Sequence, residues 1–364
     1  MRGPLAEGLD MSHRARVVRF GDTCTALALL NDRQLGRLVA AAPAVGSGVG
    51  GKSALLEIAG VPVFVKRIPL TDLERDPDNV MSTANLFAVP AFCHYGVAVV
   101  GSPGFGAWRE VASNTMTTNW VLAGLSEAFP LMYHWRVLPE AIPPPQEHAD
   151  IERVVAYWGG SAAVRRRLDA LNQASASVVL FLEYLPHRLD TWLTSQLAAG
   201  PDAVAAACAM VERSLRADVA FMNANGLLHF DAHFRNILSD GHRVYLADFG
   251  LASSPRFDLS DDERDFLARN ASHDACYAVR ELLNWMVANI VGIADPAAGG
   301  PRERYDYLRR CAAGCRPAGV PEPVAELISR HAPAVAIMND FYWNFFGVSR
   351  ETPYPGQEIA HAMA

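Results

Sequence analysis

Lysine is the scarcest charged residue in this sequence. Of its 32 basic residues only two, Lys52 and Lys66, are lysines, so arginine stands nearly everywhere that either side chain would serve. A retained lysine therefore marks a position where a compact ammonium is needed, because the wider guanidinium does not fit every crowded anion site. Lys52 lies at the end of a glycine-rich stretch, and Lys66 follows that stretch in the sequence.

The chain also lacks an excess of positive charge and any long apolar run. Its net charge of −7 argues against a nucleic-acid partner held by a basic surface. The most apolar stretch, residues 86–106, is broken by Pro90, His94 and Pro103, so no membrane span is expected. The N-terminus does not carry the pattern of a signal peptide.

Cysteine pairs at metal-binding or disulfide spacing are missing as well. The six cysteines are scattered, and only Cys311 and Cys315 lie close together in the sequence. No second Cys or His pair completes a zinc pattern. We therefore expect reduced thiols and a cytoplasmic protein.

Two aspartates and an asparagine stand in a regular pattern within residues 227–252. Asp231 follows His229 at the second position, Asn236 comes five residues after Asp231, and Asp248 follows an apolar, strand-like run. Phosphoryl transfer from ATP requires a divalent metal against the phosphates and a carboxylate near the attacking hydroxyl. Asp231 would orient the acceptor hydroxyl, and the oxygens of Asn236 and Asp248 would hold Mg²⁺.

This stretch resembles the catalytic and metal-binding loops of the protein-kinase-like superfamily, with its H-x-D-x-x-x-x-N and D-F-G signatures. The resemblance implies an α+β, bilobal protein-kinase-like fold, with a β-rich N-lobe that carries insertions and a mainly helical C-lobe. It implies ATP and Mg²⁺ as cofactors and a hydroxyl-bearing acceptor. The expected parts are a leader with first strands at 1–33, the N-lobe at 34–184 with insertions at about 71–106 and 140–175, and the C-lobe at 185–364.

The glycine-rich stretch after residue 45 fits two phosphate-binding motifs. Gly46, Gly48 and Gly51 spell the G-x-G-x-x-G of a kinase glycine-rich loop, whereas Gly46–Ser53 also spells the G-x-x-x-x-G-K-S of a P-loop NTPase. Both loops surround phosphates with backbone N–H groups, which requires residues without a Cβ atom.

The context favours the kinase motif. A P-loop requires a full helix after Lys52, but Gly60 and Pro62 interrupt any helix there. Residues 54–59 and 61–68 are instead typical of a hairpin with Gly60 in its turn. The resemblance then makes Lys66 the lysine that contacts the α- and β-phosphates.

Further site residues follow from the resemblance alone. A helix at 107–125 would supply a glutamate that pairs with Lys66; Glu110 is the first candidate and Glu74 the second. The strand at 177–186 would form the hinge, where the backbone of Glu183 and Leu185 binds adenine. Asp274, at the start of a helix, would hold the backbone of the catalytic loop.

The N-terminal part is the least regular region of the sequence. Residues 12–45 alternate short apolar runs with Arg and Asp, and we expect them to form leading strands. The long Ala-rich stretch after residue 201 predicts a helix that ends at Gly226.

The acceptor remains open between alternatives. Phe230 replaces the arginine of the usual H-R-D, and no A-P-E motif is found, whereas D-F-G is typical of protein kinases. His233 gives a D-x-H-x-x-N pattern that is similar to aminoglycoside- and choline-type kinases. The hypotheses are a protein Ser/Thr kinase-like enzyme, a small-molecule kinase, a pseudokinase that binds without turnover, and a P-loop NTPase.

Overall fold

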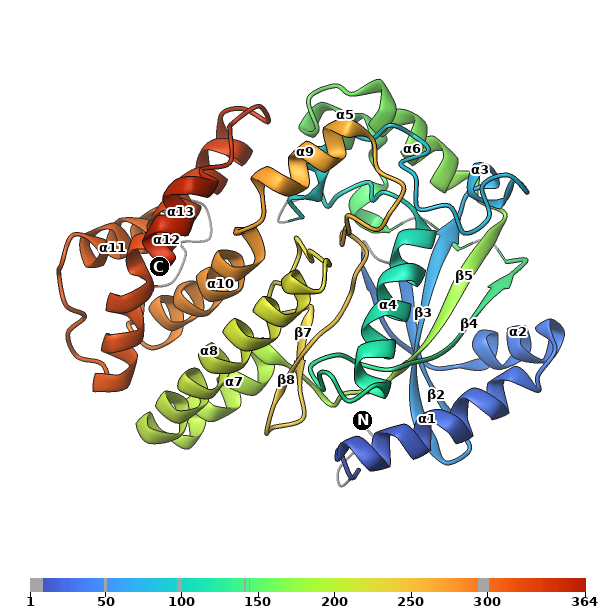
Figure 1. Ribbon diagram of the computed structural model, residues 1–364, viewed down its shortest axis with the longest axis horizontal. Helices are drawn as coiled ribbons and strands as arrows, with labels where there is room; N and C mark the ends of the chain where they lie inside the picture. Colours follow the sequence, from blue (N-terminus) through green and yellow to red (C-terminus); the bar gives the residue numbers. More distant parts are fainter. Residues whose placement is uncertain (1–8, 49–50, 97–99, 141, 144, 294–300) are drawn as a thin grey trace. The chain divides into compact units, whose positions relative to one another are not determined.

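The chain is described by a computed structural model that covers residues 9–364 apart from 49–50, 97–99, 141, 144 and 294–300. It combines helices with an antiparallel sheet, which confirms the α+β class (Figure 1). Two compact units are present, and each is built from two chain segments. Unit 1 comprises Met1–Pro186 and Tyr245–Arg264, and unit 2 comprises His187–Val244 and Asp265–Ala364.

This division differs from the predicted lobes in one important respect. The segment Tyr245–Arg264 packs with unit 1, although the sequence placed it in a C-lobe of residues 185–364. The D-F-G residues 248–250 therefore belong to the same unit as Lys66. Residues 13–33 also belong to unit 1.

The sheet of unit 1 has five antiparallel strands in the order β1-β2-β3-β5-β4. The predicted hairpin is present, because Ile58 of β2 pairs with Val61 of β3 and Gly60 turns the chain with a φ of +76°. The strands are β1 (Ala44–Gly48), β2 (Gly51–Ile58), β3 (Val61–Leu70), β4 (Met132–Leu138) and β5 (Ala176–Glu183).

The expectation of strands in residues 12–45 was wrong for most of this region. Two helices precede β1, namely α1 (His13–Ala28) and α2 (Asp32–Ala41). The side chain of Ser12 caps α1, and a reciprocal capping box with Asn31 starts α2. These polar N-caps, with Leu35 and Val39 buried four residues apart, are helix signals that outweigh the short apolar runs.

The insertions of unit 1 contain short helices. Residues 71–106 include α3 (Asp72–Arg75) and the 3₁₀ helix η1 (Ala91–His94), and residues 140–175 include η2 (Gln146–His148), α5 (Ile151–Tyr157) and α6 (Ala162–Asn172). The predicted helix after the first insertion is α4 (Ala107–Leu122).

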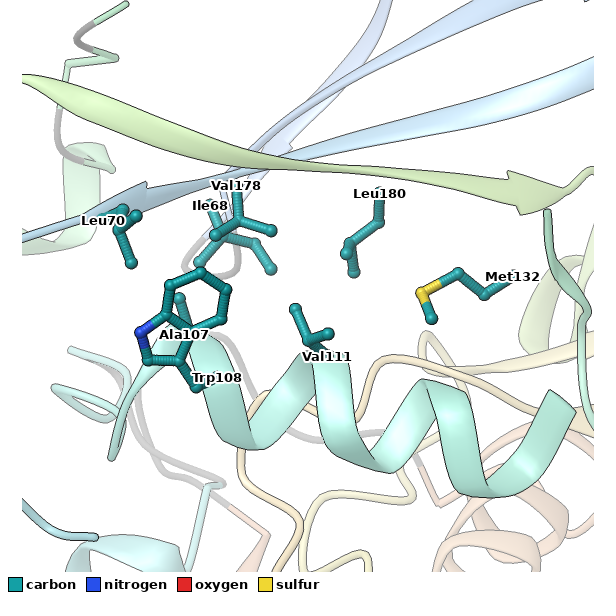
Figure 2. Close-up of a cluster of buried hydrophobic side chains, with 8 residues drawn as sticks. All are labelled: Ile68, Leu70, Ala107, Trp108, Val111, Met132, Val178 and Leu180. Atoms are coloured by element: carbon teal, nitrogen blue, oxygen red, sulfur yellow. The ribbon is translucent and has the colours of Figure 1, made fainter. Parts of the chain in front are cut away.

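One face of the sheet packs against α4. Figure 2 shows side chains of β3 and β5 that point toward α4 and meet Trp108 and Val111. The cluster is apolar and fully buried apart from its edges, so it fixes the position of α4 on the sheet. Its members are Ile68, Leu70, Ala107, Trp108, Val111, Met132, Val178 and Leu180.

Unit 2 is mainly helical, and its helices α8, α10 and α12 pack against one another. Strands β6 (His187–Arg188) and β7 (Ile237–Ser239) pair antiparallel beside them. The helices are α7 (Leu189–Ala199), α8 (Pro201–Ala224), α10 (His273–Asn289), α11 (Arg302–Ala312), α12 (Glu322–Gly347) and α13 (Gly356–Met363). Strand β8 (Val244–Leu246) and helix α9 (Asp261–Arg269) carry the chain from one unit to the other.

As predicted, a glycine follows the long helix α8: Gly226 has a φ of +78°, which only glycine adopts without strain. Over the part of the chain that the structure describes, none of the helices combines the length and the hydropathy needed to span a membrane.

Candidate active site

The alternation of β3 directs Lys66 toward α4. Residues 66, 68 and 70 share one face of the strand, because successive side chains of a strand point to opposite faces. Ile68 and Leu70 of that face pack against α4 (Figure 2). The ammonium of Lys66 meets the same helix, with its Nζ atom 2.6 Å from Oε1 of Glu110.

Lys66 also contacts the D-F-G aspartate. Its Nζ lies 2.7 Å from Oδ1 of Asp248, so one ammonium bridges two carboxylates within unit 1. We call Lys66, Glu110 and Asp248 the lysine triad. Lys66 and Glu110 are buried, whereas the side chain of Asp248 is 39% exposed. The triad therefore has two buried members and one that solvent reaches.

The second candidate partner of Lys66 has another role. Glu74 is buried, and its carboxylate accepts the N–H of Ala107 at 2.8 Å and pairs with Arg167 at 2.9 Å. Gly106 precedes Ala107 and offers no side chain to cap α4, so Glu74 supplies this cap from the helix α3. Glu74 thus fixes the start of the helix that carries Glu110.

The lysine triad contains two carboxyl groups but only one ammonium. Burial lowers the pKa of Lys66, but Asp248 and Glu110 outweigh this effect and raise the pKa above its ordinary value. Burial is the largest effect on Glu110 and raises its pKa. The ammonium of Lys66 lowers this pKa and the charge of Asp248 raises it, so that the pKa is about 7. Near neutral pH the ammonium is therefore charged and Glu110 is the group that titrates.

Glu110 should make the folded state less stable as pH rises. Its pKa is higher in the fold than the ordinary value of 4.5, so its stabilising contribution is complete below that value and is lost as pH rises through about 7. In metal-free buffer, we expect the free energy of unfolding of the wild type to fall by on the order of 2 kcal/mol relative to that of Glu110→Gln between pH 5 and pH 8. Urea unfolding at several pH values measures this difference.

Glu74 offers the matched control. It is equally buried, but although burial raises its pKa, Arg167 outweighs burial and lowers the pKa below the ordinary value. Its contribution is therefore present above that value and lost only in acid. Across the same pH range, the difference in the free energy of unfolding between wild type and Glu74→Gln should stay constant. A flat profile for Glu110→Gln as well would contradict the assignment.

The D-F-G residues have an unusual backbone. Asp248 has a φ of +63°, a left-handed conformation that aspartate tolerates better than most residues. Phe249 is buried and packs against Phe129, with ring centroids 6.3 Å apart. A Cβ atom at Gly250 would lie 3.3 Å from Oε2 of Glu110 and 3.4 Å from Oδ1 of Asp248, so glycine lets the chain pass close to the triad.

The second group of candidate residues lies in unit 2. The amide Nδ2 of Asn236 donates to the backbone carbonyl of Asp231 at 3.0 Å and to its Oδ2 at 3.1 Å. Nε2 of His233 lies 3.8 Å from Oδ1 of Asp231. These contacts hold the Asp231 carboxylate in one orientation and turn the amide oxygen of Asn236 away from it.

Asp274 holds the loop that carries Asp231. This fully buried carboxylate accepts the N–H of His229 at 2.6 Å and the N–H of Phe230 at 2.9 Å. Phe230 has a φ of +62°, which is rare for a bulky residue, and its ring is buried against Phe266. Burial raises the pKa of Asp274, but the contacts with His273 and His229 outweigh burial and hold the pKa below its ordinary value. The carboxylate therefore stays ionised.

Removing the Asp274 carboxylate should destabilise the protein strongly. In Asp274→Ala, two buried backbone N–H groups lose a charged acceptor while Phe230 still requires its strained backbone. We expect a loss of about 3–5 kcal/mol in the free energy of unfolding, measured by urea titration. Asp265→Ala, at an exposed position of α9, should change it by less than about 0.5 kcal/mol. Equal effects of the two substitutions would contradict the role of Asp274.

The predicted hinge residues lie at the end of β5. Glu183 closes the strand, and Leu185 follows as a buried residue. The carboxylate of Glu183 pairs with the buried Arg16 of α1 at 2.6 Å and accepts the N–H of Leu131 at 3.1 Å. The backbone role of Glu183 and Leu185 in binding adenine stays a prediction.

The glycine-rich stretch forms strands where it is described. Gly46 and Gly48 lie in β1, Gly51 begins β2, and the tip at residues 49–50 lies outside the described residues. The P-loop interpretation required a helix after Lys52, but a strand extends to Ile58. That interpretation is therefore wrong: the β-branched and apolar residues on both sides of Gly60 favour a hairpin.

The predicted metal ligands offer hard oxygen donors. Asp248 contributes a partly exposed carboxylate, and Asn236 contributes an amide oxygen that its own hydrogen bonds orient. Such donors fit Mg²⁺, which usually takes only one or two ligands from the protein. Within the described ranges, no group of three or more His, Cys, Asp and Glu side chains could hold a metal ion on its own.

Sequence reasoning missed several residues that support the site. They include Arg16, His94 and Arg109, whose partners lie far away in the sequence. Neither family models nor curated proteins provided a match to this chain.

Proposed function

We propose that this protein is a Mg²⁺- and ATP-dependent phosphotransferase that moves the γ-phosphate to a hydroxyl group. The observation that carries the proposal is the lysine triad, in which one buried lysine bridges a helix glutamate and the D-F-G aspartate. The resemblance to protein-kinase-like enzymes predicts that a lysine, a helix glutamate and the D-F-G aspartate lie together. The strand, hairpin and helix order of unit 1 also supports a kinase-like N-lobe.

Each residue has a role in the proposed reaction. Lys66 binds the α- and β-phosphates, and Glu110 keeps its ammonium in place. Asp231 orients the acceptor hydroxyl and accepts its proton, while Asn236 holds Asp231 through its amide group. Bound Mg²⁺ would neutralise the charge on the phosphates, and Asp248 of unit 1 is the carboxylate that we assign to it. The resemblance implies Asn236 of unit 2 as a further ligand.

The acceptor is either a protein hydroxyl or a small molecule. D-F-G supports a protein kinase-like enzyme. His233, which lies 3.8 Å from the Asp231 carboxylate, supports a small-molecule kinase because it completes the D-x-H-x-x-N pattern. The roles given to Lys66 and Asp231 are the same in both cases.

One labelling experiment tests the proposal and separates the acceptors. The purified protein is incubated with ATP labelled at the γ-phosphate and with a cell lysate, which is then divided into protein and small-molecule fractions. We expect label above the level of the Asp231→Asn variant in one fraction, and that fraction identifies the acceptor class. Equal labelling by wild type and variant in both fractions would overturn the proposal.

A further inference from the structure

The segment after D-F-G is attached to the rest of unit 1 at several points. We call residues 251–263 the D-F-G tail. At its start, the ring Nδ1 of His94 lies 2.8 Å from the backbone carbonyl oxygen of Leu251. A carbonyl can only accept a hydrogen bond, so Nδ1 of His94 carries the proton and donates it.

His94 is itself held in place. It ends the 3₁₀ helix η1, is buried, and stacks on Phe105 with ring centroids 3.7 Å apart and planes inclined by 10°. Two contacts thus fix the ring: the stacking on Phe105 and the hydrogen bond to the carbonyl of Leu251. A buried ring with so few orientations can place its N–H donor accurately.

The far end of the D-F-G tail is anchored to the same body. Arg109 of α4 pairs with Glu263 at 2.8 Å, and both side chains are buried. The guanidinium of Arg109 also donates to the carbonyl of Thr83 at 2.7 Å, and the hydroxyl of Thr83 accepts the N–H of Asp258 at 2.9 Å. The tail is therefore fixed at its start, middle and end by α4 and the insertion of residues 71–106.

The attachment point of His94 is close to the strained residue. Leu251 comes three residues after Asp248, whose left-handed backbone costs about 1 kcal/mol unless its surroundings hold it. Ser253 and Ser254 of the tail are buried. A tail held in this way keeps the Asp248 carboxylate within reach of Lys66.

We propose that His94 is a positioning residue that holds Asp248 in its metal-binding position through the carbonyl of Leu251. This proposal rests on the proposed phosphotransferase function, because it concerns the carboxylate assigned to Mg²⁺. A shift of about 1 Å at such a carboxylate is enough to weaken binding and transfer markedly. His94 contacts neither phosphate nor metal in this proposal; it acts only through the backbone of the tail.

Two substitutions separate the hydrogen bond from packing. His94→Phe keeps a flat ring that can stack on Phe105 but removes the N–H donor. His94→Asn loses the ring but keeps an N–H donor at the place of Nδ1. We expect His94→Phe to raise the Mg²⁺ concentration for half-maximal ATP binding about ten-fold, the size of one lost hydrogen bond. His94→Asn should recover most of this affinity although it packs less well.

Hydrogen exchange of the backbone amides supplies a second measurement that needs neither metal nor ATP. The amides of residues 249–252 should exchange about ten-fold faster in His94→Phe than in the wild type, and close to the wild-type rate in His94→Asn. A wild-type Mg²⁺ response and wild-type exchange in His94→Phe would overturn the inference. A wild type that binds no ATP would overturn the proposed function, and the exchange rates would still show whether His94 holds the tail.

Discussion

Replacing Asp231 with asparagine is expected to reduce phosphate transfer by about 10²- to 10⁴-fold while ATP affinity stays within about three-fold of the wild type. Asparagine has nearly the same shape and can still accept the hydrogen bond that Asn236 donates to Oδ2 of Asp231. It cannot take a proton from the acceptor hydroxyl. The substitution therefore removes the proposed chemistry and leaves the local structure almost unchanged.

The measurement compares initial rates of transfer with nucleotide affinities obtained by titration calorimetry. Asp202→Asn is the matched control, since it removes an exposed aspartate at the start of α8 and should keep both quantities at wild-type values. Normal turnover by Asp231→Asn would remove this residue from its assigned role. A large loss of ATP affinity would also be inconsistent, because it would indicate a structural effect.

The two lysines should respond very differently to substitution. Lys66→Ala is expected to lower kcat/KM for ATP by 10²-fold or more, because it removes the ammonium that we propose orients the phosphates. It also leaves Glu110 and Asp248 without the cation between them. Since Glu110 already has a pKa of about 7, it can take up a proton in the variant, and we expect the fold to persist.

Lys52→Ala provides the control that the composition of this chain makes available. Both lysines belong to β-strands that pair with each other, and the proposed phosphate contact is assigned to Lys66, which forms the triad with Glu110 and Asp248. Lys52→Ala should therefore change kcat/KM by less than about three-fold. Thermal melting of both variants shows whether each is folded. The reverse order of sensitivities would contradict the role of Lys66.

Local patterns were sufficient to predict most elements around the site. The β2–β3 hairpin with Gly60 in its turn, the helix α4 and the strand β5 were anticipated, and the structure confirms them. Lys66 and Asp248 were singled out by their motifs, and the structure brings their side chains into contact. These features depend on residues near one another in the sequence or on spacing within one motif.

The features that the sequence did not reveal depend on contacts between distant residues. Glu110 and Glu74 could not be separated, because the choice depends on which face of α4 packs against β3 and on Arg167, which neutralises Glu74. In the helix α1, Arg16 is buried against Glu183, 167 residues away. Burial of an arginine is not visible in a local apolar pattern.

The most direct test of the account is the dependence of ATP binding on Mg²⁺. Titration calorimetry of the wild-type protein with ATP, in Mg²⁺ and in EDTA, should give an affinity at least about ten-fold higher with the metal. In Asp248→Asn this difference should largely disappear, because the carboxylate that accepts from Lys66 and is assigned to Mg²⁺ is lost. Equal affinities with and without Mg²⁺ in the folded wild type would contradict the account.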